Sequence, residues 1–285
     1  MNIVMFGEDI YSATVLQSLV DAKLNVQLVI CPYYKDEHIN KGVKGVAEKA
    51  GVRLMVEKDV NSEAVRSMVQ QLKPDLILSV HLRKILKKEI FSLASKGAIN
   101  IHPSLLPKYR GLSPQHQGIM HGDRESGVTV HFIEEGIDTG DIIAQRKFEI
   151  KNDDYIFNVQ MKMLAIYKEL VVEAINLLEE ENFKPKKQDL THVSFFGPLR
   201  KEDRRIDLAR SKAEVYNLVR AVSKPYPGAF VDNYVIWHAY IPDAGETEEL
   251  KSKYPGSGII PMGEDELLMY VKDGVVVADD FEPIE

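Results

Sequence analysis

The sequence predicts an α/β protein in which a mostly parallel β-sheet, covered by helices, precedes a small β-rich domain. Strand-like and helix-like segments alternate through the first 150 residues, which is the pattern of a parallel sheet with helices on both faces. The last quarter holds short β-type segments instead. The chain has 285 residues, of which 45% are hydrophobic and 28% charged, so it can bury a core without disulfides or metals.

Short apolar segments in the first half are expected to form the strands. They are bounded by turn residues or amphipathic stretches, as buried strands are, and span residues 2–6, 26–31, 52–56, 75–80 and 98–102. Helices are expected over residues 12–20 and 43–50, and from a cap at Asn61 or Ser62 to Leu72, before Pro74. Two further strands, 128–132 and 142–149, are expected around a glycine-containing turn at 136–140.

The second half divides at a polar stretch. Residues 155–181 keep a helical apolar period, whereas residues 182–191 are polar, contain Pro185 and indicate a linker. A helix is expected at 211–222, followed by short strands at 229–231, 235–238, 258–260, 267–271 and 275–277. We therefore expect an N-terminal domain at 1–190, a connector at 191–208, and a small open-barrel-like β domain at 209–285.

Several classes of protein are disfavoured by composition. The single cysteine, Cys31, allows no intrachain disulfide and no cysteine-rich metal site, and it is expected to be a small buried hydrophobe. We expect no bound metal. No apolar run approaches the roughly 18 residues of a membrane span, and the N-terminus lacks the pattern of a signal peptide. These features predict a cytoplasmic protein that does not insert into membranes.

The charge is unevenly distributed. Residues 209–285 carry 7 Lys and Arg against 14 Asp and Glu, so the whole net charge of −7 falls in the last quarter. Nucleic-acid binding depends on cationic contacts with phosphates. An acidic C-terminal segment is poorly suited to that task.

The stretch most informative about chemistry is Asn-Ile-His-Pro-Ser-Leu-Leu-Pro-Lys-Tyr-Arg-Gly, residues 100–111. Asn100 and His102 are two residues apart on an expected strand, so their side chains project from the same face. In an open parallel sheet, ligands bind beyond the carboxyl ends of strands. An amide donor and a titratable imidazole are therefore expected at one place.

A second stretch, Glu-Glu-Gly-Ile-Asp-Thr-Gly-Asp, residues 134–141, supplies a carboxylate at Asp138. A carboxylate of this kind can orient a histidine for acid–base work. Taken singly, each residue also has an ordinary structural interpretation: His102 as a satisfied loop residue, Asp138 as a turn former, and Asn100 as a local backbone partner.

Together, the two stretches resemble the 10-formyltetrahydrofolate-dependent formyltransferase family over roughly residues 1–181. The family pattern has Asn-x-His, then Ser-Leu-Leu-Pro, and an Asp in an aspartate–glycine turn. The resemblance implies a Rossmann-like domain of the formyltransferase fold and an N-formyltransferase with Asn100, His102 and Asp138 as catalytic residues. His131 also falls on a family position, although a core role is equally open. Asp138 is expected to orient His102 and raise its pKa, or to hold a bridging water.

The resemblance also implies where the formyl donor, 10-formyltetrahydrofolate, binds as a cosubstrate. Backbone groups in two loops are expected to hold the pterin, near Arg83, Ile85, Leu86, Ile133, Glu135 and Gly136. For Ile85 and Leu86 core packing is an equal alternative, and Arg83 can also be an ordinary solvated charge.

The acceptor is expected to be the primary amine of a nucleotide-linked amino sugar. Residues 196–230 resemble the connector and second domain of the methionyl-tRNA formyltransferases and of the aminoarabinose formyltransferase domain. The chain lacks the basic insertion of the tRNA enzymes, since the loop at 33–42 is short and of mixed charge. Acidic groups at the first turn could hold an amino group, although acids favour a helix N-terminus in any case. Glu8, Ser104 and Arg110 are the expected acceptor-binding residues.

Three alternatives remain open at this point. Methionyl-tRNA formylation is the first, so tRNA is a disfavoured but retained partner. Hydrolysis of the formyl folate by the same three residues is the second, and a catalytically silent binding module is the third. The convergence of Asn100, His102 and Asp138 argues against the last, because a binding module has no need of it. The sequence leaves the oligomeric state open, a homodimer included.

Overall fold

The computed structural model describes residues 1–36 and 40–284, and it divides by contacts into two compact units. Unit 1 comprises residues 1–110, 127–147 and 162–195, and unit 2 comprises 111–126, 148–161 and the chain from 196 onward. Two segments before residue 190 thus cluster with the C-terminal part. The predicted boundaries at 190 and 209 stay a prediction. Part of the loop at 33–42 lies outside the described residues.

The sheet of unit 1 confirms the predicted fold class. Its described strands follow the order β3-β2-β1-β4-β5-β7-β8. The first five in sequence are parallel, and β7 is antiparallel to β5. The strands are β1 Asn2–Gly7, β2 Asn25–Pro32, β3 Leu54–Glu57, β4 Leu76–Val80, β5 Ala98–His102, β7 Glu125–Phe132 and β8 Ile142–Glu149.

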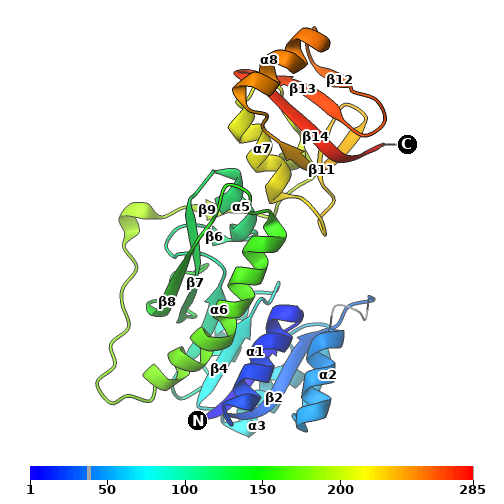
Figure 1. The fold of residues 1–285 in the computed structure, drawn as a ribbon. Coiled ribbons are helices and arrows are strands. Elements are labelled where there is room, and N and C mark those ends of the chain that lie inside the picture. Colours follow the sequence, from blue (N-terminus) through cyan, green and yellow to red (C-terminus); the bar gives the residue numbers. More distant parts are fainter. Residues whose placement is uncertain (37–39, 285) are drawn as a thin grey trace. The chain divides into compact units, whose positions relative to one another are not determined.

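Helices cover both faces of this sheet (Figure 1). They are α1 Ile10–Asp21, α2 Lys41–Ala50, α3 Glu63–Leu72, α4 Lys88–Phe91 and α6 Ile156–Leu177. The Ser62 hydroxyl accepts from the backbone N–H of Val65, so Ser62 and not Asn61 is the one of the two predicted residues that caps α3. Tyr11 of α1 and Tyr167 of α6 pack together with ring centroids 5.1 Å apart, which joins these two helices on one face.

Burial explains why the central strands read as continuous apolar runs. Every residue of β4 is buried, because helices cover the sheet on both sides. Cys31 is fully buried in β2, and burial raises the pKa of its thiol to about 12, as expected of a structural cysteine. The rigid sheet fixes the carboxyl ends of β1, β4 and β5 beside one another.

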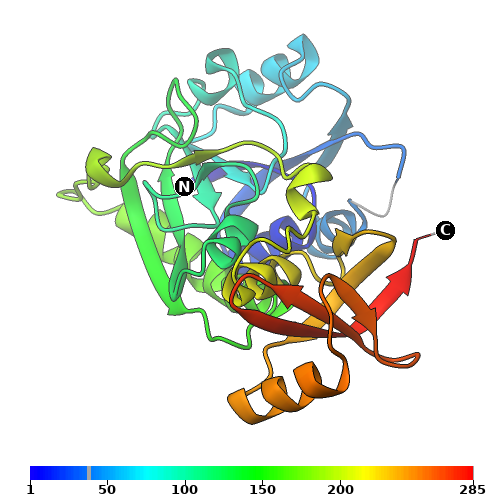
Figure 2. The same cartoon turned by 90° about the horizontal axis from the view of Figure 1, so that it is seen from above.

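Unit 2 contains an antiparallel sheet in the order β10-β11-β14-β13-β12 (Figure 2). Its strands are β10 Ala229–Val231, β11 Tyr234–Tyr240, β12 Ile259–Pro261, β13 Leu267–Val271 and β14 Gly274–Pro283. Its helix α7, Lys212–Ala221, begins at a capping box between Ser211 and Glu214. The β-rich C-terminal part is confirmed.

Some short elements are not predicted by the sequence pattern. They are β6 Arg110–Gly111, α5 Pro114–Met120, the 3-10 turns η1 Leu190–His192 and η2 Glu202–Arg204, β9 Phe195–Phe196 and α8 Ala244–Lys253. Helix α8 has almost no apolar periodicity, and Leu250 and the following Tyr254 pack it against the sheet core while the Tyr240 hydroxyl donates to Glu246.

Candidate active site

Strands β5 and β7 place the predicted catalytic residues together. The two strands are antiparallel neighbours, and Asn100 pairs in register with His131. Directly paired residues point to the same face of a sheet, so these two side chains meet. His102 ends β5 two residues later on the same face, and Asp138 lies in the loop between β7 and β8.

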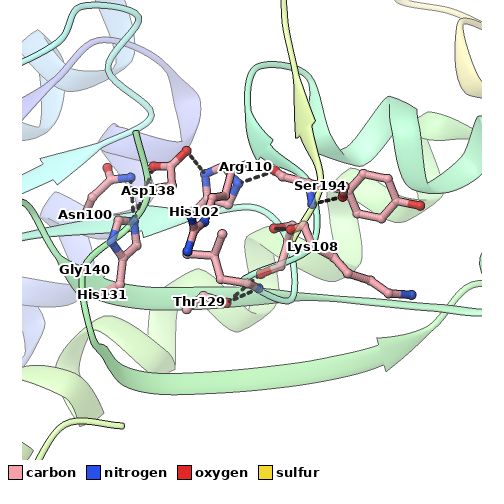
Figure 3. A network of polar contacts seen from close by, with 12 residues as sticks. Asn100, His102, Lys108, Arg110, Thr129, His131, Asp138, Gly140 and Ser194 are labelled. Atoms are coloured by element: carbon pink, nitrogen blue, oxygen red, sulfur yellow. Dashed lines mark hydrogen bonds and ion pairs between the residues drawn. The ribbon is translucent and has the colours of Figure 1, made fainter. Parts of the chain in front are cut away.

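Four side chains form one polar cluster (Figure 3). Asp138 lies between two imidazoles, with Oδ2 3.5 Å from Nδ1 of His102 and Oδ1 3.5 Å from Nε2 of His131. The amide nitrogen of Asn100 is 3.3 Å from the same His131 nitrogen. The structure therefore brings the three predicted residues together and adds His131 to them.

The hydrogen-bond partner of His102 determines where its ring proton lies. Its Nε2 is 2.8 Å from the carbonyl oxygen of Tyr109, so this nitrogen carries a hydrogen and donates it. In the neutral ring, Nδ1 then bears a lone pair facing the Asp138 carboxylate. A proton that arrives on Nδ1 is held by the attraction between imidazolium and carboxylate. The pair can thus accept a proton from a nucleophile.

Burial and charge act on His102 in opposite directions. Burial holds the pKa of His102 below its ordinary value of 6.5, and the neighbouring Asp138 raises it to a lesser extent. The expected influence of Asp138 on this pKa is present, but burial outweighs it. His102 is consequently neutral, and able to act as a base, at a lower pH than an exposed histidine.

Two residues of the site have left-handed backbone conformations. Tyr109 has a φ of 60° and Asp138 a φ of 53°. A non-glycine residue pays about 1 kcal/mol or more to adopt this conformation, Asp less than most. The turn before Asp138 includes Gly136, with a φ of 156°. Gly140 allows the turn to pass the Phe132 carbonyl, because a Cβ there would lie 1.9 Å from that oxygen.

An ion pair connects the second loop predicted to hold the folate to helix α4, which follows the first loop. Lys88 Nζ is 2.8 Å from Oε1 of Glu135. Leu86 is buried in the apolar core, and Ile133 packs against that core. The core interpretation therefore holds for the side chain of Leu86, which leaves its backbone groups to contact a ligand. Ile85 is 73% exposed, an apolar side chain left at the surface of this loop.

The expected acceptor-binding residue Glu8 has other partners. Its carboxylate is fully buried, accepts from the Tyr34 hydroxyl at 2.5 Å, and accepts from the Arg83 backbone N–H at 3.2 Å. The guanidinium of Arg83 also lies 3.2 Å away while remaining 59% exposed. Burial raises the pKa of Glu8. Glu8 therefore holds Arg83 near the carboxyl ends of the central strands β1 and β4.

Ser104 and Arg110 also make internal contacts. The hydroxyl of Ser104 donates to the Lys108 carbonyl at 2.7 Å and closes the loop after β5. Arg110 is 9% exposed, and its Nε and Nη2 donate to Oε1 of Gln188 at 3.2 and 2.7 Å. An acceptor role for either side chain stays a prediction, and the structure gives each a role in shaping the site.

Sequence reasoning missed Gln188 and the Tyr109 carbonyl. Gln188 lies in the polar stretch interpreted as a linker, with only composition to judge it by. The Tyr109 carbonyl is a backbone group, which no sequence motif marks. Both become visible only through contacts between distant parts of the chain.

Among the described residues, no group of three or more His, Cys, Asp or Glu is arranged to hold a metal ion. No helix within residues 1–36 and 40–284 combines the length and the apolar character required to cross a membrane.

Comparison with known families and proteins gives one consistent match. The family described as formyl transferase matches residues 1–175, and the formyl transferase C-terminal domain matches residues 198–284. The methionyl-tRNA formyltransferase of Kosmotoga olearia is 31% identical over 98% of this chain and 88% of its own length. That of Halothermothrix orenii is 30% identical over 97% and 90%.

Solved structures share the fold over nearly the whole chain. An N-formyltransferase from Helicobacter canadensis, in complex with folinic acid and dTDP-3-aminofucose, has a TM-score of 0.76 at 20% identity and covers 98% of this chain and 99% of its own. A sugar 3N-formyl transferase, crystallised with dTDP and 5-N-formyl-THF, has a TM-score of 0.75 at 21% identity and covers 98% and 97%.

Proposed function

The chain belongs to the formyl transferase family, and we propose that this N-formyltransferase transfers the formyl group of 10-formyltetrahydrofolate to the primary amine of a nucleotide-linked amino sugar. The observation that carries the reaction is the convergence of Asn100, His102 and Asp138 at the carboxyl end of β5. The choice of an amino sugar as the acceptor rests on the acidic charge of the C-terminal part.

In the proposed mechanism the neutral amine attacks the formyl carbon of the donor. A bond forms between the amine nitrogen and that carbon, and the bond from the carbon to N10 of the folate breaks. Asn100 donates to the oxyanion of the tetrahedral intermediate, a contribution of about 3 kcal/mol for a well-placed donor. The amine loses a proton to Nδ1 of His102, beside Asp138. The proton then passes to N10, so the site returns to its starting state.

The two loops at residues 83–86 and 133–136 are the proposed binding site for the folate. Their backbone groups supply the donors and acceptors that a pterin ring requires, and the exposed Ile85 side chain supplies an apolar surface. The exposed guanidinium of Arg83, held by Glu8, is placed to pair with an anionic group of a ligand.

The acidic C-terminal part supports a small-molecule acceptor. Several of its basic side chains are already committed: Arg210 pairs with Glu214, Lys224 with Asp280 and Lys251 with Glu248. Arg220 is buried. Binding of tRNA requires a track of available cations, since each neutralised phosphate releases counterions. A sugar nucleotide requires few charges.

Methionyl-tRNA is the second candidate acceptor. The observation that favours it is the identity of about 30% with methionyl-tRNA formyltransferases over nearly the whole chain. The two candidates use the same catalytic residues and differ in what binds beside them.

One assay separates these acceptors. The purified protein is incubated with 10-formyltetrahydrofolate and, in parallel, with nucleotide-linked 3- and 4-amino sugars or with methionyl initiator tRNA, between about 50 and 200 mM salt. We expect turnover on an amino sugar with a weak dependence on salt. Turnover on the tRNA alone, falling steeply as salt rises, would replace the first candidate by the second.

A further inference from the structure

The segment of residues 186–194, called the strap below, contacts both backbone turns that support His102 and Asp138. Its polar sequence predicts only a linker. In the structure Lys186 pairs with Ile142 through two backbone hydrogen bonds, 2.7 and 2.8 Å long, so the strap begins in register with the start of β8. That register sets where the next residues lie.

At one end of the strap, Gln188 holds the Asp138 turn. Its amide nitrogen donates to the carbonyl oxygens of Asp138 at 2.9 Å and Gly140 at 2.7 Å. Its amide oxygen accepts from Arg110 through two N–H groups, which leaves the amide nitrogen facing the turn. Gln188 and Arg110 are each only 9% exposed, so water competes little for these bonds.

At the other end, Ser194 holds the Tyr109 turn. The Ser194 hydroxyl accepts from the Tyr109 backbone N–H at 2.8 Å, and its carbonyl accepts from the Arg110 backbone N–H at 2.9 Å. Figure 3 shows Ser194 beside the loop that carries Arg110. The carbonyl of Tyr109 is the group that fixes Nε2 of His102.

Both held turns carry a residue in the left-handed backbone conformation, Tyr109 and Asp138. Such residues keep that conformation only where the surroundings enforce it. The strap supplies hydrogen bonds at both places. We propose that the strap is a positioning device, in which Gln188 and Ser194 hold the Asp138 carboxylate and the His102 ring in their mutual geometry.

This proposal rests on the roles proposed for His102 and Asp138, but not on the identity of the acceptor. Its main test is Gln188→Met, which keeps the side-chain length and removes both hydrogen-bonding groups. The matched control is Lys184→Ala, an exposed residue just before the strap. Because Gln188→Met leaves a buried guanidinium without its partner, a second variant, Arg110→Met with Gln188→Met, removes that charge as well.

The first readout is the titration of His102, followed by NMR of ¹⁵N-histidine-labelled protein and assigned by its loss in His102→Asn. Asp138 raises the pKa of His102, so a loosened Asp138 turn lowers it. We expect at least one of the two Gln188 variants to lower the midpoint by about 0.5 pH unit or more, and Lys184→Ala to leave it unchanged. This readout needs neither donor nor acceptor, so it stands even if no amino sugar is formylated.

The second readout is formyl transfer with the acceptor that the wild-type protein uses. A misplacement of about 1 Å can cost a hundredfold, so we expect kcat to fall by roughly ten- to a hundredfold with KM for the donor within about threefold. In an Asp138→Ala background, Gln188→Met should cost less than about threefold more, because both changes act on one element. An unshifted His102 titration in both Gln188 variants, or an equal loss in the two backgrounds, would overturn the proposal.

Discussion

Nδ1 of His102 lies 3.5 Å from Oδ2 of Asp138, on a ring whose Nε2 is already committed to the Tyr109 carbonyl. This relationship leaves one nitrogen of His102 for chemistry and places a carboxylate next to it. A buried imidazole that can take up a proton, yet is neutral at rest, suits the removal of a proton from an attacking amine. The predictions below follow from it.

Replacement of either member of the pair should reduce turnover strongly. We expect His102→Asn and Asp138→Ala each to lower kcat by at least about a hundredfold, because general acid–base groups contribute this much. Donor binding, measured by folate fluorescence, should survive in His102→Asn. His238→Asn is the matched control, since His238 is about half exposed and lies in unit 2. Near-normal turnover in either variant would remove the mechanism.

Removal of the amide donor should affect the transition state more than binding. We expect Asn100→Ala to lower kcat by roughly a hundred- to a thousandfold, the cost of one lost oxyanion donor. The KM for the donor should change little, because the oxyanion exists only after the attack. Steady-state kinetics with varied donor give both values. A large rise in KM with kcat unchanged would instead assign Asn100 to ground-state binding.

The pH dependence should report the buried state of His102. Its pKa is lowered in the folded protein, so the base form persists below the ordinary value of 6.5 and activity is lost only as the pH falls through the lowered pKa. We therefore expect the acid limb of kcat/KM below pH 6.5. The same shift acts on stability: between the folded and unfolded pKa the unfolded chain binds more protons, so the free energy of unfolding falls as the pH drops.

Urea unfolding at several pH values tests the second half of this prediction. The urea concentration at the midpoint of unfolding should decline below pH 6.5, and this decline should be shallower in His102→Asn. An acid limb above pH 6.5, with identical stability profiles for the two proteins, would show that His102 does not titrate as a buried base.

Gly140 should be intolerant of even one methyl group. A Cβ at this position would lie 1.9 Å from the Phe132 carbonyl oxygen, so Gly140→Ala must displace backbone next to the Asp138 turn. We expect a loss of more than about 2 kcal/mol in the free energy of unfolding, together with reduced turnover. Gly45→Ala is the control, because a Cβ there meets nothing within 4 Å and helix α2 should gain about 0.5–1 kcal/mol. Equal stability of the two variants would contradict this account.

Local sequence predicted the elements that carry two of the proposed catalytic residues. Strand β5 spans Ala98–His102 as its apolar pattern indicates, and its period of two residues places Asn100 and His102 on one face. Ser62, one of the two caps predicted for α3, caps that helix, and the helix expected at 211–222 begins beside Ser211. These features depend on residues a few positions apart, so propensity and periodicity are sufficient to find them. The family resemblance added Asp138, whose distance along the chain hides its contact with His102.

The tertiary structure decided what holds these residues in place. Arg110 was predicted to bind the acceptor but lies buried on Gln188, 78 residues away, and Gln188 in turn holds the Asp138 turn, 50 residues away. Ser194 supports Tyr109 across 85 residues. A polar linker and this mostly exposed strap have the same composition, and the register with β8, together with the burial of Gln188, distinguishes them. The sequence by itself thus determined which groups are candidates for the chemistry, whereas their precise geometry depends on long-range hydrogen bonds that no local pattern encodes.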